Sequence, residues 1–264
     1  MNSLVDEVGR VIPNDVERVF SRVDRGYFVL QNQEFTYKTI YERVGRFFGS
    51  EAISDVTLED FSSHASSIKS LISSNSLTEK LFRGPHIPFL LPQKSKLGLG
   101  DSVTDYLVNK AGESFKDQYP KFEFKFLSNT NLDLISKVNP NSRWEILNQR
   151  WENEPVIGWY FPRALAGFAI PDHSRAIKRF PPNYVLSGIP EVASAFVGLP
   201  SILEKSDGKY PNLLALTGNM PSSPDLQEFF WFFEAYGWNL YFNSRSSIGA
   251  VSEYYSGGIS VIAE

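Results

Sequence analysis

The spacing of hydrophobic residues changes near Gly84-Pro85. Before this point, apolar residues recur every three or four positions, as they do over residues 16–23, 35–48 and 57–71. This spacing is typical of amphipathic helices, and Gly84-Pro85 supplies a break after the last of them. We therefore predict a helical region over residues 1–83, which would serve as a subdomain or as a dimerisation element of a homo-oligomer.

After the break, short apolar runs alternate with helical patterns. Strands are predicted over residues 87–91, 122–127, 156–161, 184–186, 213–216, 238–242 and 259–262. Helices are predicted over residues 101–118, 142–151, 172–179, 190–197 and 225–236. Alternating strands and helices are typical of α/β domains with a parallel sheet. Residues 84–264 are therefore expected to form an α/β domain, with a mainly parallel sheet flanked by helices.

The most unusual segment of the chain is the aromatic run over residues 229–242. Nine of its 14 residues are aromatic, and Phe229–Phe233 are consecutive. As a strand, this run would be apolar on both faces. A start at Pro224-Asp225 and a stop at Gly237 favour a helix up to Tyr236. Three roles remain open: a core element, the interface of a protein–protein interaction module, or the wall of a hydrophobic pocket.

Composition excludes several classes of protein. The chain has 264 residues, no cysteine and a net charge of -4. Disulfides, iron–sulfur clusters and cysteine-ligated zinc are therefore impossible. The charge balance gives no reason to expect nucleic acid as a partner. No run of about 20 apolar residues is present to span a membrane, and no apolar signal segment opens the chain. We expect a cytoplasmic, soluble protein without a membrane partner.

Familiar catalytic motifs are missing from the sequence. It contains no phosphate-binding loop of the G-x-x-x-x-G-K-[ST] type, no G-x-S-x-G elbow and no H-E-x-x-H. Its three histidines lie far apart, so we predict no metal site. Gly98–Val103 comes nearest to a dinucleotide fingerprint, but valine replaces the third glycine and Asp101 would repel a pyrophosphate. We therefore expect no cofactor.

The ends of the predicted strands carry the best candidates for a binding site. Ligands of open parallel sheets collect beyond the carboxyl ends of the strands. Two of these ends share one pattern, a hydroxyl residue followed by glycine, and two others carry an arginine that could clamp an anion. Tyr160 could add an aromatic wall. The predicted ligand-binding residues are Tyr160, Arg163, Ser187, Gly188, Thr217, Gly218 and Arg245. Our first hypothesis is a small polar or anionic ligand, held without turnover.

An enzymatic hypothesis rests on one histidine. His173 follows Asp172 at the predicted start of a helix. A histidine oriented by a neighbouring carboxylate, here Asp172 or Glu191, can act as a general base. The chain would then be a hydrolase or transferase, with His173 and Asp172 as its catalytic residues.

Overall fold

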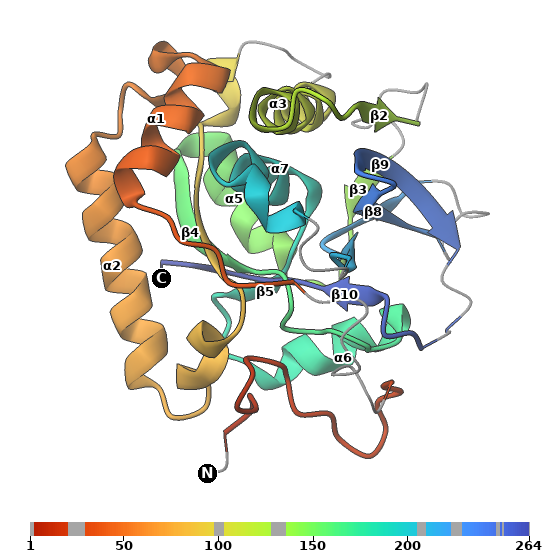
Figure 1. The fold of residues 1–264 in the computed structure, drawn as a ribbon. Coiled ribbons are helices and arrows are strands. Elements are labelled where there is room, and N and C mark those ends of the chain that lie inside the picture. The colour runs from red at the N-terminus through yellow and green to blue at the C-terminus, as the bar shows by residue number, and fades with distance from the viewer. Residues whose placement is uncertain are drawn as a thin grey trace.

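The fold is known from a computed structural model, which describes residues 3–20, 30–97, 103–127, 136–204, 210–222, 229–246, 249 and 251–263 (Figure 1). Over these residues the chain forms six α-helices and eleven strands. The helices are α1 (Tyr37–Phe48), α2 (Leu58–Ser74), α3 (Val103–Gln118), α5 (Trp144–Asn153), α6 (His173–Ala176) and α7 (Ile189–Gly198). The strands are β1 (Ile87–Leu91), β2 (Phe124–Phe126), β3 (Ser136–Val138), β4 (Val156–Phe161), β5 (Tyr184–Leu186), β6 (Leu213–Leu216), β7 (Asn219–Pro221), β8 (Phe229–Tyr236), β9 (Asn239–Ser246), β10 (Tyr255–Gly257) and β11 (Ile259–Ile262).

Two sheets hold most of the strands, and neither is mainly parallel. One sheet has the order β1–β4–β11–β5, and all of its pairs are antiparallel. The other has the order β10–β6–β8–β9–β2. In this second sheet β10–β6 and β2–β9 are parallel, while β6–β8 and β8–β9 are antiparallel. Strands β3 and β7 form a small antiparallel pair. The predicted α/β fold with a mainly parallel sheet flanked by helices is therefore wrong.

The reason lies in how the strands are connected. A helix between two strands produces a parallel pair only when it returns the chain to the same sheet. Here α7 follows β5 of the first sheet and leads to β6 of the second. Strands β1 and β4 are neighbours in one sheet, yet α3, β2, β3 and α5 lie between them in the sequence. The elements themselves were predicted better than their directions, and five strands have the expected bounds: 87–91, 156–161, 184–186, 213–216 and 259–262.

The aromatic run is a strand and not the predicted helix. Its described part is β8, which pairs with β6 on one side and β9 on the other; residues 223–228 lie outside the described residues. Alternate side chains enter different layers: Phe230 and Phe232 pack in a small cluster with Leu213, and Trp231 and Phe233 join the main core. A central strand covered on both faces reads as a continuous apolar run, which is why the helix prediction was wrong here.

The β8–β9 hairpin closes with a two-residue turn. Gly237 has φ 57° and Trp238 has φ 74°. Two consecutive residues with positive φ are typical of the tight turn whose twist matches that of antiparallel strands. This turn leaves Tyr236 and Trp238 as large exposed side chains, 66% and 46% accessible.

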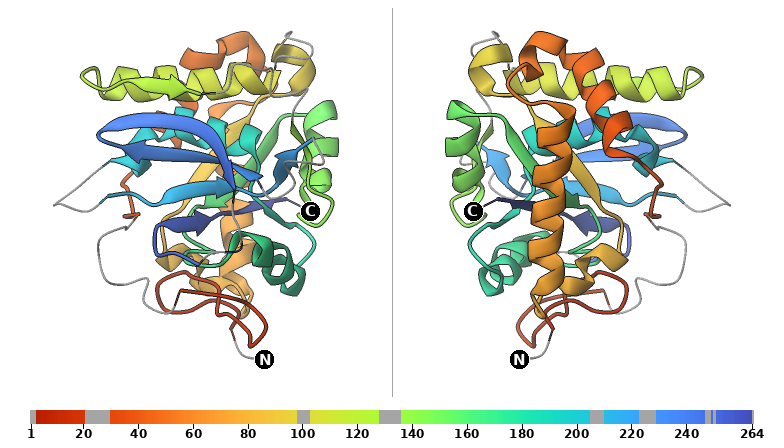
Figure 2. Two further views of the ribbon diagram at one scale, coloured as in Figure 1. Left: turned by 90° about the vertical axis from the view of Figure 1, so that its right-hand side faces the viewer. Right: turned by 90° about the vertical axis from the view of Figure 1, so that its left-hand side faces the viewer.

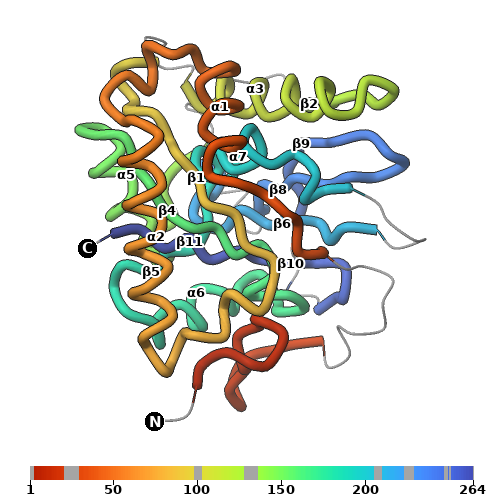
Figure 3. The backbone as a smooth tube through the Cα atoms, turned by 60° about the vertical axis from the view of Figure 1, so that its left-hand side comes forward, coloured from red at the N-terminus to blue at the C-terminus, as the bar shows by residue number. Residues whose placement is uncertain are grey.

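Helix α7 lies between the two sheets (Figures 1 and 3). All of its residues are buried, as expected for a helix with no solvent face. The Phe196 ring lies 6.3 Å from Tyr160 of β4 and 4.9 Å from Phe233 of β8. On the opposite face of β4, the Trp159 indole donates a hydrogen bond to the carbonyl of Ala65 in α2, at 2.8 Å. The first sheet is thus sandwiched between α2 and α7.

Two helices predicted over residues 1–83 are confirmed, as α1 and α2. Thr57 and Asp60 form a capping box at the start of α2, each side chain accepting the backbone N–H of the other residue. The helix predicted over 16–23 is wrong over its described residues, 16–20, where Val19 forms a β-bridge with Phe168; residues 21–29 lie outside the description. Figure 2 shows α2 along one side and the N-terminal segment next to α6. The division into domains at residue 83 stays a prediction.

Candidate functional site

The two hydroxyl–glycine turns of the sequence lie in direct contact. Ser187-Gly188 follows β5 and Thr217-Gly218 follows β6, and the Gly218 N–H donates to the Ser187 carbonyl at 2.8 Å. A Cβ atom at Gly218 would lie 2.6 Å from the carbonyl oxygen of Leu186 and 2.8 Å from the amide nitrogen of Gly188. Only glycine permits so close a backbone approach. These four predicted ligand-binding residues are therefore neighbours.

A buried carboxylate connects these turns to the rest of the core. Glu191, in the first turn of α7, is fully buried. Its Oε1 accepts the Gly188 N–H at 2.6 Å and the Ser260 hydroxyl at 3.1 Å, and its Oε2 accepts the Trp144 indole N–H at 2.9 Å. Ser260 also shares a 2.9 Å hydrogen bond with Ser187. We call these five residues the buried polar network. Burial raises the pKa of Glu191, and these hydrogen bonds lower it by less.

Tyr160 and His173 pack beside the network, where the chain passes from β10 to β11. A Cβ at Gly257 would collide with the His173 ring, and one at Gly258 would collide with the Tyr160 ring. The Tyr160 hydroxyl is buried and has no hydrogen-bond partner among the described residues. Burial and then the charge of Glu191 raise its pKa well above the ordinary value. The hydroxyl is therefore protonated at neutral pH.

His173 is enclosed by protein. Its Nδ1 lies 3.2 Å from the Thr217 hydroxyl, and its side chain is fully buried. The pKa of His173 is lowered to about 4, because the effect of burial outweighs two effects that raise it, a hydrogen bond with the backbone of Phe168 and the charge of Asp172. The ring is neutral at pH 7 and lines none of the three described pockets. Its role as a general base stays a prediction.

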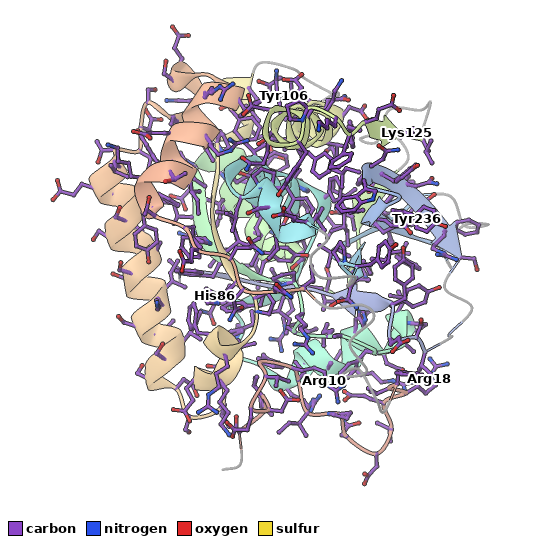
Figure 4. All side chains as sticks on the ribbon, in the orientation of Figure 1. Arg10, Arg18, His86, Tyr106, Lys125 and Tyr236 are labelled. Atoms are coloured by element: carbon purple, nitrogen blue, oxygen red, sulfur yellow. The ribbon has the colours of Figure 1, made fainter. Side chains whose placement is uncertain are left out.

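The Asp172 carboxylate forms ion pairs with two exposed arginines, Arg18 and Arg175. Its carboxylate accepts both the Arg18 guanidinium, at 2.8 Å, and the Arg18 backbone N–H, at 3.0 Å. It also forms an ion pair with Arg175 at 3.2 Å. Burial raises the pKa of Asp172, but the hydrogen bonds and charges of these arginines outweigh burial and lower it. Arg18 is labelled in Figure 4, on the N-terminal segment beside α6. Asp172 thus fastens that segment, and no described hydrogen bond joins it to the His173 ring.

The two predicted arginines come from other segments of the chain, and Arg245 is exposed, unlike the buried residues of the cluster. Arg163 is partly buried in the turn that follows β4. Arg245 is an exposed residue of β9, with its guanidinium 5.7 Å from the centre of the Tyr255 ring. The structure therefore brings together Tyr160, His173, Ser187, Gly188, Thr217 and Gly218, and it does not place Arg245 with them. The assembled residues form a closed core without a described opening to solvent.

An open polar pocket lies directly beside this closed core. It has a volume of about 180 Å³ and lies between α5, the β3–β7 pair, the start of α3 and the segment after β1. The side chains of Val138, Trp144, Trp151 and Pro190 form its apolar part. The polar lining consists of Lys94, Thr104, Ser136, Lys137, Asn148 and Asn219. We call it the α5 pocket. Trp144 belongs to both the pocket and the buried polar network.

Asn219 links the α5 pocket to the hydroxyl–glycine turns. It follows Gly218 and is 8% exposed. Its Oδ1 accepts the Ile189 N–H at 2.7 Å, which fixes the orientation of the amide. Its Nδ2 has no hydrogen-bond acceptor among the described residues, although Asn219 lines the pocket. An amide N–H on the wall of a pocket can donate a hydrogen bond to a ligand oxygen.

Two lysines give the α5 pocket its charge. Lys94 reaches it from the segment after β1, with its ammonium 2.5 Å from Glu152 and 5.3 Å from the centre of the Trp151 ring. Lys137 is an exposed residue of β3 that forms no ion pair with any described residue. The described lining contains no Asp or Glu. Sequence reasoning found neither lysine, because nothing in their local sequence marks them; only the fold brings residues 94, 137 and 219 together.

Three further observations concern metal ions, membranes and known proteins. Among the described residues, no three histidine or carboxylate side chains cluster in a way that could hold a metal ion. Nor does any described helix have the length and apolar character needed to cross a membrane. No family model, curated protein or solved structure matches this chain.

Proposed function

We propose that the protein binds a small anionic ligand in the α5 pocket and does not transform it. The observation that carries this proposal is the composition of the pocket: two lysines and the Asn219 amide, with no carboxylate in the described lining. Ammonium groups and amide N–H groups are the natural partners of phosphate or carboxylate oxygens. The ligand belongs to the class expected from the sequence, but its binding site is the α5 pocket and not the carboxyl ends of parallel strands.

The position of Asn219 supports binding rather than chemistry. Its amide is held by the Ile189 N–H and by the backbone that continues from Gly218. A donor held rigidly before the ligand arrives loses little freedom on binding. The described lining of the α5 pocket contains no histidine and no carboxylate that could act as a general base. Binding without turnover is the function that this set of groups supports best.

Calorimetric titration with inorganic phosphate and with malonate, at constant ionic strength, tests the proposal. We expect the variants Lys137→Gln and Lys94→Gln each to weaken binding about five-fold or more, since a charge-assisted contact contributes roughly 1–3 kcal/mol. Lys178→Gln removes the same charge from an exposed position outside the pocket, and its affinity should equal that of the wild type. Equal losses of affinity in all three variants would show that binding depends only on the net charge of the protein, and this result would overturn the proposal. The absence of binding to the wild type would overturn it as well.

A further inference from the structure

A second pocket, lined mainly by aromatic side chains, lies at the C-terminal end of α3. It is formed by Phe115, Tyr119, Phe122, Tyr210, Trp238 and Glu204, together with two aliphatic side chains. We call it the α3 aromatic pocket. Figures 1 and 2 show α3 lying over the β8–β9 hairpin, whose turn carries Trp238. The pocket shares no lining residue with the α5 pocket.

The aromatic rings of this pocket form a connected wall. The rings of Phe115 and Tyr119 lie 5.1 Å apart, and those of Tyr119 and Phe122 lie 6.3 Å apart. Phe122 stacks on Trp238 with a ring separation of 5.4 Å and an angle of 20° between the planes. A ring face carries partial negative charge, so a pocket lined mainly by aromatic rings can attract a cation.

Trp238 is the exposed member of the wall. All five tryptophans of the chain are among the described residues, and the other four are at most 3% exposed, whereas Trp238 is 46% exposed. Its backbone has φ 74°, in the left-handed region that non-glycine residues seldom adopt. An indole held at the surface on a tight turn, against a second ring, gives a ligand a large and firmly placed contact.

Two sources of negative charge lie at the same pocket. Glu204 is exposed at its rim and acts, after burial, to raise the pKa of Tyr119. The last turn of α3 contributes Phe115, and Tyr119 follows the end of the helix. The C-terminal end of a helix carries a partial negative charge that favours cations. The positive charge of Arg43 acts in the opposite direction and lowers the pKa of Tyr119. Arg43 does not line the pocket, and its guanidinium forms an ion pair with Asp117 at 3.3 Å.

We propose that the α3 aromatic pocket binds an organic ammonium ion, with a trimethylammonium group as its preferred form. Methylated ammonium ions are weakly hydrated and spread their charge over methyl groups that fit between ring faces, which is how aromatic cages recognise them. The described lining holds a carboxylate and no lysine or arginine, so its charge is opposite to that of the α5 pocket. This inference does not depend on anion binding there.

Two probes of equal shape separate charge from apolar contact. Choline and its uncharged carbon isostere, 3,3-dimethylbutan-1-ol, are titrated into the wild-type protein, and the tryptophan fluorescence is followed. We expect choline to bind at least about five-fold more tightly than the alcohol, the range that cation–π attraction allows. Equal affinities would show an ordinary apolar pocket, and no fluorescence change with choline would show no site; either result overturns the proposal.

Three variants then locate the site. Trp238→Leu should weaken choline binding about ten-fold, and Glu204→Gln should weaken choline but not the uncharged alcohol. Affinities for Trp238→Leu are measured by calorimetry, because that variant lacks the fluorescent reporter. Tyr236→Leu is the matched control: Tyr236 is an exposed aromatic residue of the same hairpin, labelled in Figure 4, and it does not line the pocket. A loss in Tyr236→Leu as large as that in Trp238→Leu would overturn the assignment.

Discussion

The substitution Glu191→Gln tests the buried polar network most sharply. The Glu191 carboxylate accepts three hydrogen bonds, from Gly188, Trp144 and Ser260. Glutamine has nearly the same shape but only one acceptor oxygen. If that oxygen takes the place of Oε1, it keeps the bonds from Gly188 and Ser260. The amide NH₂ group then faces the Trp144 indole N–H, and two donors oppose each other in the core.

The size of the effect follows from these contacts. A hydrogen bond to a charged group contributes about 1.5–3 kcal/mol, and a buried donor left unpaired costs about 1–3 kcal/mol. Removing a buried charge offsets part of this loss, because burial raises the pKa of Glu191. We therefore expect Glu191→Gln to lower the free energy of unfolding by about 2–4 kcal/mol.

Urea unfolding at several pH values provides the assay. A folded-state pKa above the ordinary glutamate value means that the folded protein binds this proton more tightly than the unfolded chain. The contribution of Glu191 to stability therefore falls as the pH rises from the ordinary value through the raised one. The glutamine variant lacks that part of the pH dependence. Glu145→Gln, an exposed change in the first turn of α5, should alter stability by less than about 0.5 kcal/mol.

A double-mutant cycle isolates the contact between Glu191 and Trp144. Trp144→Phe removes the indole N–H, so it should cost about 1 kcal/mol less in the Glu191→Gln background than in the wild type. The hydrogen-bond reasoning would be refuted by a Glu191→Gln protein that is as stable as the wild type, or more stable, at pH 7. Additive effects of the two substitutions would also refute it.

Three further predictions concern the residues around this network. Gly218→Ala should lower the free energy of unfolding by about 3 kcal/mol in urea titrations, because the new Cβ would meet rigid backbone atoms of Leu186 and Gly188. Gly45→Ala is the control and should be close to neutral, because its Cβ would meet only the flexible end of the Ile53 side chain. Tyr160→Phe should leave the free energy of unfolding unchanged or raise it, because the Tyr160 hydroxyl has no hydrogen-bond partner among the described residues. Tyr184→Phe should lower it by about 1 kcal/mol, because the Tyr184 hydroxyl donates to Thr78 at 3.0 Å. Equal losses in the two variants would contradict the view that the Tyr160 hydroxyl is unpaired. Because the pKa of His173 is lowered to about 4 in the fold, stability should fall as the pH decreases from about 6.5 toward 4. That fall should be smaller in His173→Gln, while His86→Gln reports the separate part that belongs to His86, whose pKa burial also lowers.

Local patterns of the sequence predicted single elements well, and they did not predict how the elements pair. The amphipathic spacing over 57–71 and the cap at Thr57 correspond to α2. Strand direction depends on which sheet a chain enters after each helix, and no local pattern encodes that choice. The β8 strand was predicted as a helix for another reason: a central strand and a buried helix are both apolar throughout, so the pattern does not distinguish them.

The candidate site was predicted in part. The repeated hydroxyl–glycine pattern drew attention to Ser187, Gly188, Thr217 and Gly218, and the fold brings them together. The pattern signals close backbone packing, because a side chain at Gly218 would collide with the neighbouring turn. The charged groups of the α5 pocket could not be found in this way. Lys94, Lys137 and Asn219 come from three distant segments, and each lysine taken alone is an ordinary surface residue.

The side-chain amide of Asn219 gives the most direct test of anion binding in the α5 pocket. Inorganic phosphate is titrated into ¹⁵N-labelled protein at constant ionic strength, and the NH₂ resonances of the asparagines are followed. We predict a saturable shift for Asn219, while the amide of Asn183, which donates to the Ile262 carbonyl elsewhere in the core, stays in place. An unmoved Asn219 resonance at phosphate concentrations that shift others would contradict the proposed site.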